Sequence, residues 1–160
     1  GSGDTMSEQQ QPAPIVVGVN GSVRSINGLR WAARQARLTG AEVQAVVGWE
    51  VPVTIMVVPT YTEADYARDA RQVLDRAVAE VQAEEPDVRI TAHLIQKRAG
   101  LALTNAAEGA QLLVVGSHSY SGDELPGVHL GSVASYCVHH ASCPVVVIRG
   151  HQLPATGTSG

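Results

Sequence analysis

The sequence of 160 residues contains no phenylalanine, and aromatic residues make up only 4% of it. Its apolar fraction of 44% is nevertheless typical of a globular protein, so valine, isoleucine, leucine and alanine must fill the core. An interior of this kind favours strands that are buried on both faces, as in parallel sheets. The length predicts a single domain.

Positively charged residues are scattered, and the formal net charge is −4. Nucleic-acid binding relies on clustered Lys and Arg side chains that displace counterions, so we expect no nucleic-acid partner. Long apolar runs are absent as well, since no stretch approaches the ~20 residues of a membrane span. We therefore expect no membrane partner and no signal peptide.

The chain has only two cysteines, Cys137 and Cys143. The first falls within an expected helix and the second at the exit of that helix, which argues against a disulfide between them. This cysteine usage favours a reducing, cytoplasmic location.

Polar and structure-breaking residues gather at both ends of the chain. We interpret residues 1–5 as the remnant of a cloning tag and the whole of 1–14 as a flexible segment. One domain then spans 15–150, and a disordered tail spans 151–160.

Apolar residues alternate between strand-like and helix-like spacing along this domain. We expect strands over 15–19, 43–49, 88–95, 112–115 and 145–148. We expect helices from Ser22 or Ser25 to Gly40, from near Thr62 to Pro86, over 101–108 and over 132–140. Strict alternation predicts an α/β protein, with a five-stranded parallel sheet and helices on both faces.

In such sheets ligands bind beyond the carboxyl ends of the strands, where the strand order reverses. We expect the first and fourth strands to flank this crevice, and the loops that follow them, 20–22 and 116–130, are rich in Gly and Ser. The connection after the second strand is unusually apolar over Val51–Val58. Whether it forms an extended strand, a lid or a patch that a partner covers stays open.

The loop after the fourth strand has features of a phosphate site. Its glycines leave room for a ligand: Gly116, Gly122, Gly127 and Gly131. Gly131 and Ser132 open the last helix, whose first N–H groups are free to meet an anion. However, the loop contains no Lys or Arg and carries the carboxylates Asp123 and Glu124. The residues alone leave two interpretations open, a nucleotide site or a surface turn that caps the helix.

Four longer stretches carry a more specific signature. They are "IVVGVNGS" at 15–22, "LRWAARQARLTGAEV" at 29–43, "QLLVVGSH" at 111–118 and "LGSVASYCVHHASCPVVVI" at 130–148. Together they resemble the universal stress protein family over about Ile15–Arg149. The resemblance implies a nucleotide-binding fold of five parallel strands in the order 3-2-1-4-5, usually as a homodimer.

ATP-binding members of that family carry a loop of Gly, two residues, Gly, nine residues, and Gly followed by Ser or Thr. Gly116 and the pair at 131–132 match the two ends of this pattern. Ser119 occupies the position of the second glycine, and eleven residues rather than nine separate it from Gly131. Gly122 is the candidate for the missing role after a local rearrangement.

Asn20 stands where the family has an adenine-contacting Asp, and its amide can both accept and donate a hydrogen bond. Gly18 and Gly48 match positions whose backbone lines the adenine pocket. The resemblance thus implies binding of ATP or another adenine nucleotide, with or without Mg²⁺. The nucleotide-binding residues expected on this basis are Gly18, Asn20, Gly48, Gly116, Ser117, His118, Gly122, Gly131, Ser132 and Val133.

The last strand is apolar and is expected at the edge of the sheet, where it risks aggregation unless something covers it. Antiparallel pairing with the same strand of a second copy covers it under two-fold symmetry, and the resemblance implies the same interface. We expect a homodimer through Val145, Val146, Val147 and Ile148.

Two other groups of residues suggest chemistry. Cys137 and His140 have the spacing of a zinc-binding pair, although an ordinary helix end is the simpler interpretation. Ser22 with His118 suggests a hydrolase, but no Gly-x-Ser-x-Gly motif and no orienting third group accompany them. We therefore expect neither a metal site nor a catalytic residue.

Three functions are compatible with the sequence. The favoured one is a dimeric regulatory module that binds ATP or another adenine nucleotide in a stress response, with little or no turnover. The second is an interaction protein of the same fold that does not bind nucleotide and acts through the dimer and Val51–Val58. The third is a slow ATPase that uses Asp123 or Glu124 with a metal.

Overall fold

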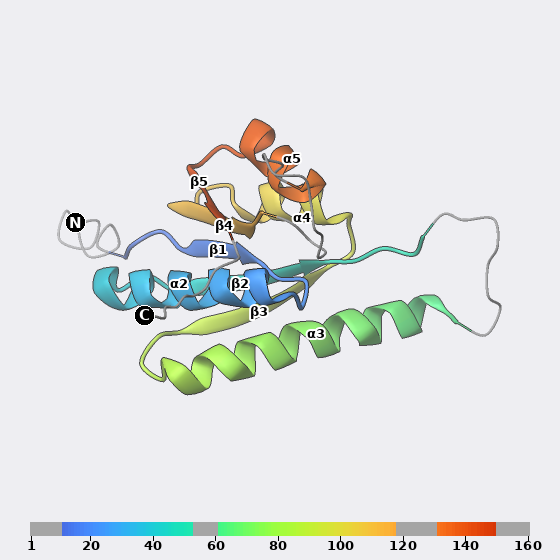
Figure 1. Cartoon of the computed structure of the whole chain (residues 1–160), viewed down its shortest axis with the longest axis horizontal. Coiled ribbons are helices and arrows are strands. Elements are labelled where there is room, and N and C mark those ends of the chain that lie inside the picture. Colours follow the sequence, from blue (N-terminus) through green and yellow to red (C-terminus); the bar gives the residue numbers. More distant parts are fainter. Residues whose placement is uncertain (1–10, 53–60, 118–130, 150–160) are drawn as a thin grey trace, which may run out of the picture.

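The computed structural model describes residues 11–52, 61–117 and 131–149 of the chain. Strands and helices alternate along it (Figure 1). The strands are β1 (Ile15–Gly18), β2 (Val43–Gly48), β3 (Ile90–Ile95), β4 (Leu112–Gly116) and β5 (Val145–Ile148). The helices are α2 (Val23–Thr39), α3 (Glu63–Glu84), α4 (Ala99–Ala106) and α5 (Ser132–His140). The predicted α/β class is confirmed.

The five strands form one parallel sheet in the order β3-β2-β1-β4-β5, as predicted. In the central strand β1, Ile15 is in register with Val43 of β2 on one side and with Leu112 of β4 on the other. The chain runs outward from β1 to β3 and then crosses back to β4, so the strand order reverses between β1 and β4. A crevice is expected at the carboxyl ends of these two strands.

Helices cover both faces of the sheet, with α2 and α3 on one face and α4 and α5 on the other (Figure 1). The core under α2 and α3 contains large, fully buried side chains such as Leu29 and Leu74. The core under α4 and α5 is smaller and includes Val16, Val46 and Leu113 of the strands. Strands buried on both sides explain why the sequence is rich in valine and needs few aromatic residues.

The two long helices begin at side-chain caps. In α2 the Oγ of Ser22 accepts a hydrogen bond of 3.1 Å from the backbone N–H of Ser25, so Ser22 rather than Ser25 is the cap. The helix ends at Gly40, whose φ of 81° is the left-handed conformation that glycine favours. In α3, Thr62 and Asp65 form a reciprocal capping box.

Two predicted boundaries are wrong by two residues. β3 begins at Ile90 rather than Val88, because residues 85–88 form a turn in which the backbone N–H of Val88 bonds the carbonyl of Glu85. α4 spans Ala99–Ala106 rather than 101–108, because Ala102 already bonds back to the carbonyl of Arg98. Both differences lie at element ends, which apolar spacing locates least well.

The chain just before β1 is attached to the sheet through Gln111. Its backbone N–H donates to the carbonyl of Pro14 at 2.9 Å, and its Nε2 donates to the carbonyl of Ala13 at 2.7 Å. Residues 13 and 14 are therefore tied to the strand β4 that follows Gln111. Among the described helices, none has the length and apolar character needed to cross a membrane.

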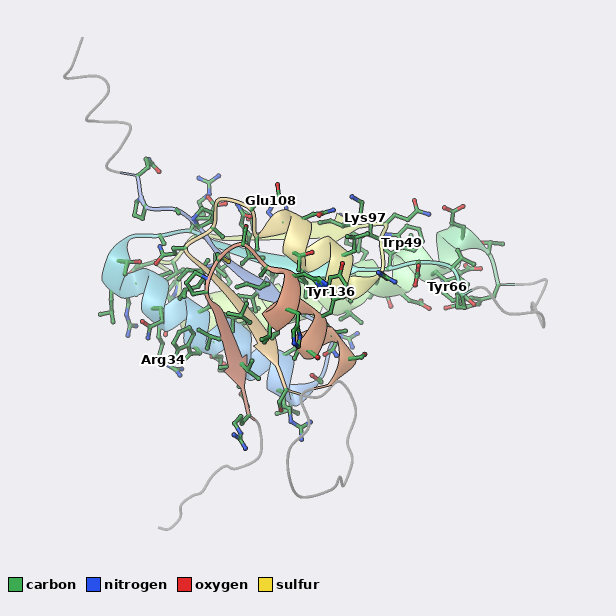
Figure 2. All side chains as sticks on the ribbon, turned by 90° about the horizontal axis from the view of Figure 1, so that it is seen from above. Arg34, Trp49, Tyr66, Lys97, Glu108 and Tyr136 are labelled. Carbon is green, nitrogen blue, oxygen red and sulfur yellow. The ribbon has the colours of Figure 1, made fainter. Side chains whose placement is uncertain are left out.

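One end of the molecule is formed by the segment after β2 and the first turns of α3, where Trp49 and Tyr66 lie (Figure 2). The rings of Tyr61 and Tyr66 meet edge to face with their centroids 4.8 Å apart. Of the apolar stretch Val51–Val58, only Val51 and Pro52 are described, and the side chain of Val51 is 41% exposed. The rest of that stretch lies outside the described residues.

Candidate functional site

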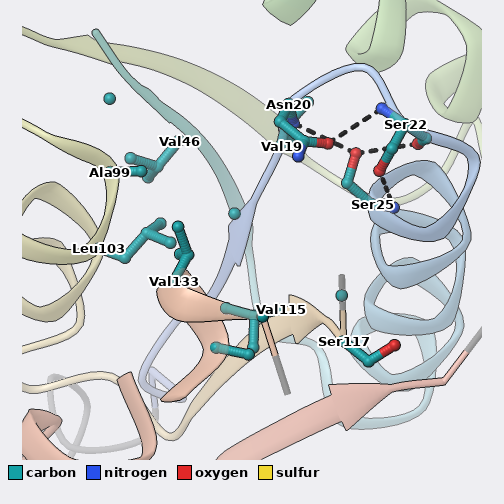
Figure 3. A pocket seen from close by; sticks show the side chains of 15 residues that line it. Val19, Asn20, Ser22, Ser25, Val46, Ala99, Leu103, Val115, Ser117 and Val133 are labelled. Atoms are coloured by element: carbon teal, nitrogen blue, oxygen red, sulfur yellow. Dashed lines mark hydrogen bonds between the residues drawn. The ribbon is translucent and has the colours of Figure 1, made fainter. Parts of the chain in front are cut away.

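A hollow opens at the carboxyl ends of β1 and β4, where the strand order reverses (Figure 3). It encloses about 510 Å³ of empty space, part of which is open to solvent. The lining residues are Gly18, Val19, Asn20, Ser22, Ser25, Val46, Gly48, Ala99, Leu103, Val115, Gly116, Ser117, Gly131, Val133 and Ala134.

One wall of the hollow is apolar. Four elements contribute side chains to this wall (Figure 3): Val46 of β2, Leu103 of α4, Val115 of β4 and Val133 of α5. The polar groups lie on the other side, at the start of α2 and the end of β4. This division suits a ligand that has a flat apolar part and a polar or anionic part.

Two glycines at strand ends allow α4 to approach the sheet closely. A Cβ atom at Gly18 would lie 2.6 Å from Cδ1 of Leu103, and one at Gly48 would lie 2.8 Å from the carbonyl oxygen of Lys97. The contact at Gly48 is with backbone, so a side chain there would require α4 to move, whereas the contact at Gly18 is with the end of the flexible Leu103 side chain, which would have to turn away. The absence of a side chain at these positions therefore brings α4 against the sheet and shapes the apolar wall.

Asn20 and two serines form a closed hydrogen-bond network at the start of α2 (Figure 3). The Oδ1 of Asn20 accepts from the backbone N–H of Ser22 at 3.0 Å, and the backbone N–H of Asn20 donates to Oγ of Ser25 at 3.2 Å. The Ser25 hydroxyl in turn donates to the carbonyl of Ser22 at 3.0 Å. The oxygen of Asn20 therefore already accepts one hydrogen bond, and the side chain offers a ligand the remaining lone pair of that oxygen and the two N–H donors of its amide.

The two described ends of the loop between β4 and α5 are joined directly. The backbone N–H of Gly131 donates to the carbonyl of Ser117, and the N–H of Ser117 donates to the carbonyl of Ile148 at 2.9 Å. Neither of these two amides is therefore free for an anion, although the glycine and serine motif alone would suggest that both are. The available amides are those of the first turn of α5, whose N-cap Gly131 makes no side-chain capping bond.

Most of the expected nucleotide-binding residues come together in the hollow. Those that line it are Gly18, Asn20, Gly48, Gly116, Ser117, Gly131 and Val133. Ser132 is exposed beside the hollow and is not part of its lining. His118 and Gly122 lie outside the described residues, as do the carboxylates at 123 and 124.

Sequence reasoning missed several lining residues, among them Val46, Ala99, Leu103 and Ala134. Val46 lies two residues before the expected adenine-pocket position Gly48, on the same side of the strand, so strand alternation could have found it. The residues of α4 carry no such signal, because they reach the hollow only through the close contact with Gly18 and Gly48.

The zinc interpretation of Cys137 and His140 does not fit the structure. Cys137 is fully buried, and burial raises the pKa of its thiol to about 11, so the thiol stays protonated and a poor metal ligand. His140 is exposed, and its ring lies against Tyr136 with the centroids 4.2 Å apart. Both cysteines are free thiols. Within the described part of the chain, no three His, Cys, Asp or Glu side chains group as metal ligands do.

The fold and the hollow agree with a comparison of the sequence with known families. Residues 13–149 match the sequence model of the universal stress protein family. The chain belongs to that family. Its relatives include "Universal stress protein Rv2005c" of Mycobacterium tuberculosis, which is 33% identical over 148 residues, covering 92% of this chain and 49% of that protein. The chain thus spans about half the length of the curated relatives it matches.

Solved structures of the universal stress protein family have the same fold. One from Archaeoglobus fulgidus superposes with a TM-score of 0.67 at 26% identity and covers 89% of this chain and 98% of its own. A second from the same organism, in complex with dAMP, has a TM-score of 0.64 at 27% identity and covers 85% of this chain and 97% of its own.

Proposed function

We propose that this universal stress protein is a dimeric regulatory module that binds ATP or another adenine nucleotide in the hollow between β1 and β4. The observation that carries the proposal is the position of the hollow, beyond the carboxyl ends of the two strands at which the strand order reverses. The related protein from Archaeoglobus fulgidus in complex with dAMP supports an adenine nucleotide as the ligand.

The two sides of the hollow bind different parts of the nucleotide. The base lies against the apolar wall of Val46, Leu103 and Val115, where it is removed from water. The phosphates lie at the start of α5, whose first N–H groups lack a side-chain cap and whose dipole favours negative charge. Among the described residues, the polar side chains that line the hollow are hydroxyls and an amide, which hold a ligand but neither attack nor deprotonate one readily. This lining supports regulation by nucleotide occupancy as the proposed role.

The binding proposal is tested by thermal unfolding with ATP, ADP, AMP or cyclic AMP, with and without Mg²⁺. A ligand at about 100 times its Kd stabilises the native state by about 2.7 kcal/mol, which raises Tm by about 5–10 °C in a protein of this size. Val133→Trp fills the hollow and should abolish the shift. Val138→Trp is the matched control, because Val138 lies on the same helix with its side chain 45% exposed. A shift that survives Val133→Trp places the ligand elsewhere.

The dimer is proposed to form through the edge strand β5. Its four residues are all partly exposed, and β4 is its neighbour within the described sheet. The carbonyl of Pro144 accepts a hydrogen bond from Leu113 of β4 and that of Ile148 from Ser117 just after β4, so by alternation the N–H and C=O groups of Val145 and Val147 face the open edge. An antiparallel copy of β5 would pair with these groups and protect the edge.

Proline substitution tests this interface without disturbing the rest of the sheet. Val147→Pro removes an N–H that faces outward, so it should convert dimer to monomer in analytical ultracentrifugation while the monomer stays folded. Val146→Pro is the control, because it removes an N–H that faces β4 and should destabilise the monomer itself. A dimer that persists in Val147→Pro would show that another surface associates.

An interaction protein that binds no nucleotide is the second candidate. It is favoured by the network at Asn20, whose side-chain oxygen already accepts a hydrogen bond from Ser22 and so has one lone pair rather than two left for an adenine amino group. In that case none of the four nucleotides shifts Tm, while the dimer through β5 persists. Both versions of the proposal place the protein in a reducing, cytoplasmic setting, in keeping with its two free thiols.

A further inference from the structure

Arg24 has an unusual environment in the first turn of α2. Its Nε atom is buried, and it has no hydrogen-bond partner among the described residues. Buried polar atoms are nearly always paired, so an unpaired nitrogen on a cationic side chain needs a physical reason. A ligand that supplies the missing acceptor is one such reason.

The position of Arg24 points to the hollow. Its side chain begins directly beside the end of β4, since a Cβ atom placed on Gly116 would lie only 3.1 Å from the Cβ of Arg24. Gly116 lines the hollow, and so do Ser22 and Ser25 on either side of Arg24 in the sequence. In Figure 3 the two serines and Ser117 mark this side of the hollow. Arg24 therefore stands at the margin where the polar part of a ligand would lie.

The charges around Arg24 favour an anion. None of the described residues that line the hollow has a charged side chain, and the first turn of α2 contains no acidic residue. Two other arginines of the same helix are neutralised, Arg30 by Glu80 and Glu84 and Arg37 by Glu85. Across residues 11–52, 61–117 and 131–149, no carboxylate lies within ion-pair distance of Arg24.

We infer that Arg24 binds the phosphate chain of the nucleotide and makes the site selective for nucleoside di- and triphosphates over nucleosides. The inference rests on the proposed function, because it requires a nucleotide in the hollow. A guanidinium presents a planar set of N–H donors that matches phosphate oxygens and stays charged at all physiological pH values. Arg24 thereby supplies the positive charge that the loop after β4 lacks.

The test compares Arg24→Gln with Arg34→Gln by isothermal titration calorimetry. Arg34 is an exposed residue of the same helix (Figure 2) and does not line the hollow, so its substitution removes the same charge outside the site. The ligands are adenosine, AMP, ADP and ATP. Arg24→Gln should weaken ATP binding by about 10- to 100-fold, as expected for a lost charge-assisted hydrogen bond, and leave adenosine binding unchanged. Arg34→Gln should change neither by more than about twofold.

The outcomes separate this inference from the function on which it rests. If the unmodified protein binds none of the four ligands, both the proposed function and the inference are overturned. If it binds ATP but the two variants lose equal affinity, or if Arg24→Gln weakens adenosine as much as ATP, the role of Arg24 is overturned and the nucleotide site stands. Arg24→Lys, which keeps the charge, should recover part of the ATP affinity, and Tm values without ligand check that each variant is folded.

Discussion

The helices on the two faces of the sheet differ in length, capping and packing. On one face, α2 and α3 have 17 and 22 residues, and each begins with a side-chain cap. On the other, α4 and α5 have 8 and 9 residues, and neither has a side-chain capping bond. Ion pairs between Arg30 and Glu84 and between Arg37 and Glu85 join the long helices to each other and to the turn after α3.

The short helices instead pack closely against the sheet and against each other at glycine positions. α4 contacts β1 and β2 through Gly18 and Gly48, and a Cβ atom at Gly100 of α4 would lie 2.8 Å from the ring of Tyr136 in α5. The hollow opens on this side, next to an uncapped helix start. The comparison indicates that the face of α2 and α3 supplies most of the stability, whereas the face of α4 and α5 supplies the shape of the site.

Leu74→Ala should give the largest effect on stability. Leu74 of α3 is fully buried in the core under the long helices, and truncation of such a side chain costs about 2–5 kcal/mol. Urea unfolding measures the loss, and Leu38→Ala, at a side chain that is 77% exposed, should stay within about 0.5 kcal/mol. Nucleotide affinity of the folded protein should not change. A cost below about 1 kcal/mol at Leu74 would remove the distinction between the two faces.

Gly48→Ala should have a smaller effect on stability but should also alter the site. The new Cβ would lie 2.8 Å from the backbone carbonyl of Lys97, so α4 must move, at a cost of about 1–3 kcal/mol. Because α4 forms the apolar wall, nucleotide affinity should fall as well. The control is Gly28→Ala in α2, whose Cβ would lie 3.4 Å from Val114 and which should stabilise the helix by up to about 1 kcal/mol. Equal effects of the two substitutions would contradict the steric role of Gly48.

Gly48 also shows how far the sequence alone can go. The alternation of strand-like and helix-like spacing of apolar residues predicts every strand and helix of the described fold. The strand order follows from the family resemblance. The family resemblance, rather than the spacing of apolar residues, predicts that Gly48 lies at the ligand pocket. Which atoms a glycine approaches depends on how two distant segments pack, and the sequence contains no local sign of the contact with Lys97.

The same limit applies to the anion site. The Gly and Ser residues at 116, 117, 131 and 132 predict its location, but not which of their amides are free. The N–H of Ser117 is used by the neighbouring strand β5, and that of Gly131 closes the loop onto Ser117. Similarly, the oxygen of Asn20 is used by Ser22. Hydrogen bonds of this kind depend on tertiary structure. A sequence motif therefore predicts where an anion site lies, but not which of its backbone N–H groups are free to bind the anion.

Thr62→Ala should destabilise the protein by about 1 kcal/mol, because it removes the capping box of α3. Thr62 does not line the hollow, so nucleotide affinity should stay unchanged. Ser22→Ala removes the corresponding cap of α2 at a similar cost, but Ser22 lines the hollow, and its loss should also weaken binding. Chemical unfolding and calorimetry on the two variants separate stability from binding. If neither substitution lowers the free energy of unfolding, side-chain caps do not explain why the face of α2 and α3 should be the more stable one.

Loss of the ion pair between Arg30 and Glu84 should change the free energy of unfolding least, and the pH dependence of that change tests whether charge is its cause. The hydrogen bond from Arg30 lowers the pKa of Glu84 below its usual value of 4.5. A carboxylate whose pKa is depressed in the folded state contributes stability above its unfolded pKa and loses it as the pH falls through the folded value. Arg30→Gln should therefore be slightly less stable than the unmodified protein at neutral pH, and the difference should shrink as the pH falls below 4.5 and through the lowered pKa of Glu84. Because both side chains are partly exposed, high salt should shrink the difference as well. A difference that is the same in acid and at neutral pH would mean that Arg30 joins the long helices through packing of its aliphatic stem rather than through charge.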